Sequence, residues 1–186
     1  MAKIIAGLFT SVDGVIDEPQ NWHFPYFDEA VGEVVGSLMK PALLVGRVTW
    51  AGFAEYFTSE EGKAGQPEIA AQMTGTPKYV VSTTLESADA WDNSTLLGAD
   101  WAARLREIKA GDGPDLGMSG SVALIRSLIA EGLLDELHLI VHPVVVGKGA
   151  RLFPEGGDGV ELKLISSTTL PNGTIHVAYE PLAPAA

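Results

Sequence analysis

The pattern of apolar and polar positions is most informative between residues 116 and 153. A short apolar stretch from Leu116 leads into small residues at positions 119–121. Apolar residues at helical spacing follow, at Val122, Ile125 and Ile129. This spacing predicts an amphipathic helix that Gly132 ends, and a longer apolar stretch over 136–146 predicts the next strand. The segment therefore predicts a strand, a helix and a second strand, as in α/β proteins.

The rest of the chain continues this alternation. Short, continuous apolar stretches predict buried strands over residues 4–9, 42–46 and 78–82. Apolar residues at helical spacing predict helices over residues 28–39 and 99–110. Between these elements we expect a polar loop over residues 10–27 and a Gly-rich surface segment over residues 60–76, with one helical turn around Ile69.

Near the end of the chain, the pattern changes to that of a β-hairpin. Two strand-like stretches, 162–170 and 174–179, flank the turn-forming pair Asn172-Gly173. The chain is therefore predicted to be a single α/β domain over residues 1–180, with an antiparallel hairpin at its C-terminal end and a loose tail at 181–186.

Composition and charge narrow the classes of function. The chain has 186 residues, of which 46% are hydrophobic and 19% charged, as expected of a globular domain. Its net charge of −12 opposes nucleic-acid binding, because a phosphate backbone is bound by clustered Lys and Arg. The basic residues are scattered singly, and no apolar stretch approaches the ~20 residues of a membrane span. We therefore expect a cytoplasmic protein that binds neither nucleic acid nor membrane.

Several kinds of site are excluded by the residues available. The chain has no cysteine, which excludes disulfides, thiolate zinc sites and cysteine nucleophiles. Of its four histidines, His138 and His142 alternate on one predicted strand, but no third ligand is evident, so no metal site is predicted. Lys148 follows a glycine as in a P-loop, but the Ser or Thr that must come next is missing.

Three of the predicted strands end in small or polar residues suited to a phosphate. Backbone N–H groups at the start of a helix, hydroxyls and a guanidinium all bind phosphate oxygens. The carboxyl ends of parallel strands lie at one edge of a sheet, where ligands bind in open α/β folds. Each group alone is also compatible with an ordinary turn or a capped helix start, but three at one edge favour a phosphate site. The residues are Gly46, Arg47 and Thr49, then Ser82, Thr83 and Thr84, and then Ser119, Gly120 and Ser121.

Asp28 is the best candidate for proton transfer. It lies three residues before Val31 and seven before Val35, so it shares the apolar face of its predicted helix. A carboxylate there is expected to be partly desolvated, which would raise its pKa toward use as an acid. The alternative is that Asp28 stabilises the helix N-terminus electrostatically, and its position is compatible with both roles.

Three motifs together resemble the dihydrofolate reductase-like superfamily, and within it the reductase domain of riboflavin biosynthesis, which is the C-terminal domain of the deaminase-reductase. They are Ser11-Val12-Asp13-Gly14, the stretch 45–50, and the stretch 120–153 with its Leu134-Asp135-Glu136-Leu137. The resemblance covers residues 4–179. It implies a three-layer sandwich in which helices flank a central, mostly parallel sheet, with NADPH as the hydride donor and a homodimer as the assembly.

The resemblance also implies roles for single residues. Gly46, Arg47 and Thr49 would contact the phosphates of NADPH, and Ser82 and Thr83 would lie beside its 2′-phosphate, with Arg47 as the main counter-charge. Gly120, Ser121 and Val122 would hold the pyrophosphate, and Ala6 would border the nicotinamide. Trp22 and Asp28 resemble the substrate-binding tryptophan and acid of the folate-reducing branch.

Two departures from the family pattern bear on the substrate. Where the folate branch carries an arginine for the folate carboxylate, this chain has Thr76-Pro77-Lys78. Where the riboflavin enzymes carry a basic residue after the Asp-Gly pair, this chain has Val15. The expected function is an NADPH-dependent reductase similar to the 5-amino-6-(5-phosphoribosylamino)uracil reductases, with hydride transfer to a C=N or C=O acceptor. A dihydrofolate reductase and a non-catalytic nucleotide-binding dimer are the alternatives.

Overall fold

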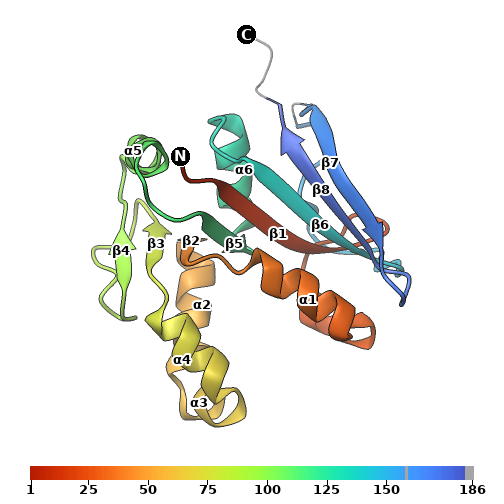
Figure 1. The fold of residues 1–186 in the computed structure, drawn as a ribbon, viewed down its shortest axis with the longest axis horizontal. Coiled ribbons are helices and arrows are strands. Elements are labelled where there is room, and N and C mark those ends of the chain that lie inside the picture. Colours follow the sequence, from red (N-terminus) through yellow and green to blue (C-terminus); the bar gives the residue numbers. More distant parts are fainter. Residues whose placement is uncertain (158, 183–186) are drawn as a thin grey trace.

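Eight strands form a single sheet in the computed structural model, which describes residues 1–157 and 159–182 (Figure 1). The strand order is β4-β3-β2-β5-β1-β6-β8-β7. Pairing is parallel from β4 to β6, whereas β8 runs antiparallel to both β6 and β7. The mostly parallel sheet and its antiparallel C-terminal strands confirm the predicted fold class. The strands are β1 (Ile4–Ser11), β2 (Ala42–Gly46), β3 (Lys78–Val81), β4 (Ser94–Leu96), β5 (Leu116–Ser119), β6 (Glu136–His142), β7 (Leu162–Thr169) and β8 (Ile175–Pro181).

Helices cover both faces of the sheet, because alternate residues of the central strands are apolar on either side. In β2, Leu44 packs in a core cluster with Leu105 and Ile125, whereas its neighbour Leu43 packs with Trp50 in a second cluster. The first cluster lies under α5 and α6 and the second under α2 and α4, and α1 covers a third around Ile140 (Figure 1). The helices are α1 (Glu29–Leu38), α2 (Arg47–Thr58), α3 (Glu60–Gly65), α4 (Pro67–Gly75), α5 (Trp101–Ala110) and α6 (Val122–Ala130).

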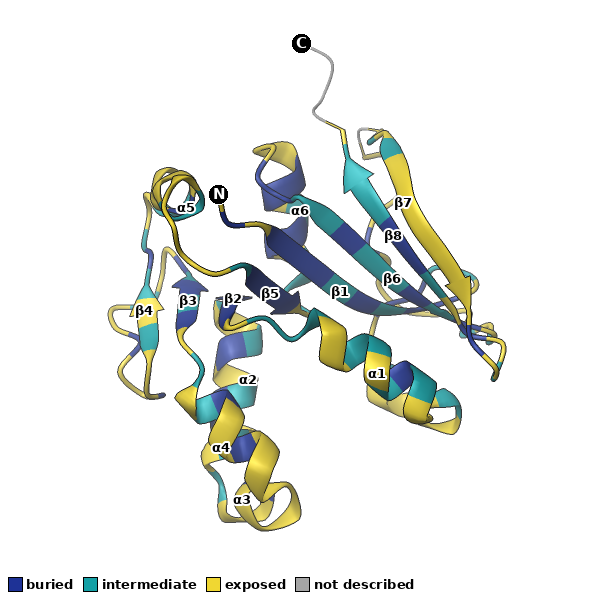
Figure 2. Cartoon of the chain, in the orientation of Figure 1, coloured by how far each residue is buried: buried dark blue, intermediate teal, exposed yellow. Residues whose placement is uncertain are grey.

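Burial falls from the centre of the sheet to its edge. Figure 2 shows β1 and β5 largely in dark blue and the outer strand β7 in yellow. In β1, Ile4 and Ala6 are fully buried, whereas in β7 Leu164 and Ile165 are 55% and 49% exposed. The centre of the sheet therefore forms the core, and β7 forms an open edge.

The segment predicted as a Gly-rich surface excursion, 60–76, instead folds as two helices. Ser59 caps α3 by accepting a hydrogen bond from the N–H of Gly62, and Pro67 occupies the first turn of α4. At the other end of α4, the buried ammonium group of Lys78 donates to the carbonyls of residues 73, 74 and 76. These capping contacts offset the poor helix propensity of the glycines.

The structure differs from the prediction in three further places. The strand predicted over 136–146 ends at His142. Pro143 follows, and the carbonyl of Val144 accepts the N–H of Val12 instead of a bond from a neighbouring strand. The three-residue strand β4 was not predicted. In the predicted loose tail, Pro181 belongs to β8 and Leu182 donates to the carbonyl of Glu161, while residues 183–186 lie outside the described part.

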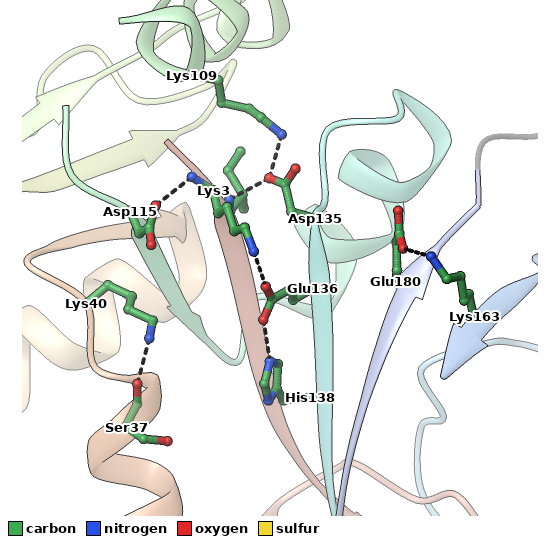
Figure 3. A network of polar contacts seen from close by, with 11 residues as sticks. Lys3, Ser37, Lys40, Lys109, Asp115, Asp135, Glu136, His138, Lys163 and Glu180 are labelled. Carbon is green, nitrogen blue, oxygen red and sulfur yellow. Dashed lines mark hydrogen bonds and ion pairs between the residues drawn. The ribbon is translucent and has the colours of Figure 1, made fainter. Parts of the chain in front are cut away.

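A polar network joins the amino ends of β1, β5 and β6 (Figure 3). The ammonium of Lys3 pairs with Glu136 at 2.7 Å, and Glu136 also contacts His138 at 3.0 Å. Nearby, Asp135 pairs with Lys109 of α5 and accepts the backbone N–H of Ile4. These contacts fix the strand ends at the edge opposite the one at which β2 and β5 lead into their helices. No helix in the described ranges is long and apolar enough to cross a membrane.

Candidate active site

Two strand-to-helix turns meet at the carboxyl edge of the sheet. The hydroxyl of Ser121, just before α6, accepts the backbone N–H of Gly46 at 2.9 Å. In return, the hydroxyl of Thr49 in α2 accepts the backbone N–H of Ser121 at 3.1 Å. These reciprocal hydrogen bonds hold the N-termini of α2 and α6 beside each other, as the sequence predicted for the ends of parallel strands.

The turn before α6 has an unusual backbone. Both Gly120 and Ser121 have left-handed conformations, with φ values of 71° and 57°. Glycine adopts this region freely, but a serine there costs free energy that its surroundings must offset. The two hydrogen bonds of Ser121 supply such an offset. The turn thus directs the first N–H groups of α6 toward the edge of the sheet, where they are available to an anion.

The residues predicted to bind phosphate differ in whether their side chains already have hydrogen-bond or ion-pair partners. Arg47 begins α2, is exposed, and forms no ion pair with any residue in the described ranges. Thr83 is also exposed, but the buried hydroxyl of Ser82 accepts the N–H groups of Thr84 and Leu85 and so shapes its own turn. Two helix N-termini, a free guanidinium and an exposed hydroxyl form a donor set that fits the phosphates of NADPH. The individual contacts to the cofactor stay predictions.

A cavity of about 300 Å³ opens beside these turns. Its walls come from β1, β5, the last two turns of α1, the start of α2 and the loop after β1. Thr49, Gly120 and Val122 belong to its lining, so the cavity is continuous with the candidate phosphate site. Gly7 also lines it, whereas the predicted nicotinamide neighbour, Ala6, is fully buried in the core under α6.

The two predicted substrate residues lie outside the cavity wall. The indole of Trp22 is buried and its N–H donates to the carbonyl of Asp17 at 3.0 Å. Asp28 is the N-cap of α1, and its carboxylate accepts the N–H of Val31 at 3.0 Å. The partial burial predicted for Asp28 is wrong, because the residue is exposed and its carboxylate is engaged as the N-cap of α1. The residues of α1 that do line the cavity are Val35 and Leu38.

The loop over residues 10–27, predicted only as polar, is anchored by stacked rings. The ring of His23 stacks on Phe9 with centroids 4.6 Å apart, and His142 meets both Phe9 and Trp22 edge-on at 5.4 Å. Burial lowers the pKa of both histidines below its ordinary value, so the neutral imidazoles are favoured. The signal for this cluster is the run of five ring-bearing residues within positions 22–27.

Asp13 joins the same loop to the segment after β6. Its carboxylate accepts the Ser11 hydroxyl at 2.6 Å and the backbone N–H groups of Val146 and Gly147 at 3.0 and 2.9 Å. These hydrogen bonds lower the pKa of Asp13 to about 2. Asp13 therefore supports its own turn through Ser11 and links this turn to residues 146 and 147 after β6.

Comparisons with known proteins agree with this architecture. Residues 2–176 match the sequence model of the RibD C-terminal domain family. The uncharacterized protein YyaP of Bacillus subtilis (strain 168) is 26% identical over 189 residues, which cover 95% of this chain and 94% of YyaP.

Two solved structures show the same fold at lower identity. A protein from Shewanella sp. PV-4, described as a candidate riboflavin biosynthesis protein, has a TM-score of 0.71 at 20% identity, covering 98% of this chain and 99% of its own. A dihydrofolate reductase from Enterococcus faecalis, in complex with NADP(H) and RAB-propyl, has a TM-score of 0.61 at 14% identity, covering 96% of each chain.

Proposed function

The chain belongs to the RibD C-terminal domain family, and from this we propose that it is an NADPH-dependent reductase that transfers a hydride to a C=N or C=O carbon. The observation that carries the proposal is the joined pair of helix N-termini at the mouth of a cavity. An anion-binding edge beside a ligand-sized cavity is the arrangement that a dinucleotide and a second substrate require.

Arg47 is the residue that favours NADPH over NADH. The two cofactors differ by one phosphate on the adenosine ribose, and a guanidinium binds phosphate through several N–H groups at once. Because Arg47 is exposed and lies at the first residue of α2, its charge adds to the positive end of the helix dipole. Thr83 provides an exposed hydroxyl for the same phosphate.

The chain's contribution to the reaction is orientation and exclusion of water. When bound, NADPH supplies the hydride. The apolar wall formed by residues such as Phe9, Leu38 and Met118 keeps water from the acceptor and holds it in one plane against the sheet. No titratable side chain occurs among the described residues that line the cavity. The proton therefore reaches the acceptor from a water molecule at the open mouth of the cavity, and not from a side chain of the apolar wall.

The dihydrofolate reductase alternative is weakened by Lys78. It lies in the segment where the folate branch carries an arginine, but its ammonium is buried and donates to three carbonyls at 2.7 to 3.1 Å. It also lies 4.2 Å from the centre of the Trp91 ring. A lysine engaged in this way cannot reach a ligand without unfolding the end of α4.

The test is direct measurement of cofactor binding and turnover. Isothermal titration of the purified protein should show tighter binding of NADPH than of NADH. NADPH oxidation is then followed with the deaminated riboflavin precursor, dihydrofolate and a neutral carbonyl compound in parallel. Equal affinities for the two cofactors would contradict the assignment of Arg47. Tight NADPH binding without turnover of any acceptor would favour the non-catalytic nucleotide-binding alternative.

A further inference from the structure

We infer that the acceptor of this site is a small, flat, uncharged molecule and not a phosphorylated one. The inference rests on the proposed function, because it concerns the part of the same cavity that lies beyond the cofactor turns. It is carried by the chemistry of the cavity wall, by the position of the nearby cations, and by the close approach of α1 to the sheet.

The wall of the cavity is apolar. Among the described residues that line it, none carries a charged side chain, and the only side-chain hydroxyls, those of Thr49 and Ser119, lie on the cofactor side. A phosphate or carboxylate transferred from water into such a wall loses its hydration without gaining a counter-charge, which costs several kcal/mol or more. An uncharged ring pays no such cost and gains from the burial of its surface. The apolar lining comprises Gly7, Leu8, Phe9, Ile16, Pro19, Val35, Leu38, Met39, Leu43, Phe53, Gly117, Met118, Gly120, Val122 and Ile140.

Two cations near this edge, Arg151 and Arg126, already donate to backbone carbonyls, whereas the exposed Arg47 lies on the cofactor side. The guanidinium of Arg151 donates to the carbonyl of Asp13 at 3.1 Å, and that of Arg126 donates to the carbonyls of residues 151 and 152. The residue after the Asp-Gly pair, Val15, is fully buried and pairs through its backbone with Arg151. The next residue, Ile16, contributes an apolar side chain to the wall. The loop after β1 thus supplies the wall with hydrophobic surface and with no positive charge from the residues described there.

The cavity is narrow because α1 ends in close contact with the sheet. A Cβ atom at Gly7 would come within 2.8 Å of the Leu38 side chain, and one at Gly117 within 2.8 Å of the Leu38 carbonyl oxygen. At Gly117 only glycine allows so close an approach, because the contact is with a backbone carbonyl, whereas at Gly7 the end of the Leu38 side chain would have to turn away. With a volume of about 300 Å³, the cavity is at the small end of the range for ligand sites. A planar ring system matches this narrow, apolar space, whereas a phosphate attached to it would find no counter-charge in the lining.

Binding of a matched pair of probes tests the inference without turnover. We use 2-naphthol, which is uncharged, and 2-naphthoate, which has the same rings and a carboxylate. Each is titrated into the unmodified protein with fluorescence detection, in the absence and presence of NADP⁺. We expect 2-naphthol to bind about tenfold more tightly, or better, since the carboxylate must lose its hydration in the cavity. Equal or tighter binding of 2-naphthoate overturns the inference, and so does failure of both probes to bind.

A lysine placed in the wall provides the complementary test. Val35→Lys adds an ammonium to the cavity lining and should narrow or reverse the preference for 2-naphthol. Ser37→Lys adds the same charge to an exposed position two residues later in α1 and should leave the preference unchanged. A preference that stays the same in Val35→Lys, while circular dichroism shows the fold intact, contradicts the location of the site.

The outcomes separate this inference from the proposed function. If NADPH binds more tightly than NADH but 2-naphthoate binds as well as 2-naphthol, the reductase proposal stands and the substrate class is wrong. If 2-naphthol binds with the expected preference but NADPH does not bind, the cavity takes an uncharged ligand and the reductase proposal fails.

Discussion

At the scale of single residues, we expect Arg47 to determine whether the protein distinguishes NADPH from NADH. Replacing it by alanine removes a charge-assisted contact worth ~1.5–3 kcal/mol, so the ratio of the two affinities should fall by about ten- to a hundredfold. Binding of NADH should hardly change. Isothermal titration of both cofactors measures the ratio. Lys63→Ala, at an exposed position of α3, serves as the control and should keep the ratio of the parent protein.

Asp28 is expected to act as a helix cap. Asparagine caps helices as well as aspartate does, so Asp28→Asn should leave the free energy of unfolding nearly unchanged. It should change the turnover rate by no more than about twofold. Asp28→Ala removes the acceptor for the N–H of Val31 and should lower the free energy of unfolding by ~1 kcal/mol. Urea unfolding and steady-state kinetics measure both. A fall in turnover of ~10²–10⁴ in Asp28→Asn would restore the predicted role as the acid.

The contacts among site residues could not be predicted from local pattern. Small residues at positions 46 and 119–121 indicated a turn that binds phosphate, and the structure joins the two turns. The hydrogen bonds that join them connect Gly46 and Thr49 to Ser121, which lies more than seventy residues away. The exposure of Asp28 depends in the same way on how its helix is set on the sheet. Residue type and spacing thus predict which groups are present, whereas their availability to a ligand is decided by tertiary packing.

At the scale of elements, the buried strands and the amphipathic helices were the predictable part of the fold. The strand β2 has the predicted bounds, because its apolar residues are buried on both faces of the sheet. The helices α3 and α4 were missed because contacts beyond their own apolar pattern stabilise them, including the ammonium of Lys78. The strand β4 has only three residues, Ser94–Leu96, too few for a period to be recognised.

The ring cluster that anchors the loop over residues 10–27 should make stability depend on pH. Burial lowers the pKa of His23 and His142 below 6.5 in the folded protein. The unfolded chain therefore binds more protons than the folded protein as the pH falls below 6.5, and the free energy of unfolding must decrease. Urea unfolding near pH 7.5 and at about pH 5.5 measures this decrease. His142→Phe keeps a ring in the cluster but cannot titrate, so its stability should fall less over the same interval.

A matched variant in the same cluster separates titration from packing. Tyr26 meets His142 edge-on with ring centroids 5.8 Å apart. Tyr26→Phe keeps that ring and leaves both histidines in place, so its loss of stability on acidification should equal that of the parent protein. The dependence that persists in His142→Phe comes from His23 in the same cluster and from His176, whose pKa is lowered by burial and by the nearby His138. An unchanged dependence in His142→Phe would show that His142 does not titrate in this interval.

At the scale of the whole molecule, β7 leaves the sheet with an uncovered edge. Its eight residues carry a single charged side chain, Lys163, and Leu164 and Ile165 are about half exposed (Figure 2). A long edge strand exposes unpaired backbone groups to any other strand, and monomeric proteins usually protect such an edge with charges or prolines. The edge is therefore suited to pairing with a partner, and we expect a second copy of the same chain related by a two-fold axis, the simplest arrangement.

We accordingly expect a homodimer in which the strands β7 and β8 contribute to the interface. Light scattering at micromolar concentration should give about twice the chain mass of 19.6 kDa. Ile165→Lys places a charge on the exposed edge and should shift the particle toward the monomer, because an unpaired charge buried in an interface is costly. Val145→Lys changes an apolar residue of greater exposure, 71%, in the loop after β6, and should leave the dimer intact. A particle of 19.6 kDa in the unmodified protein would show that the edge is tolerated without a partner.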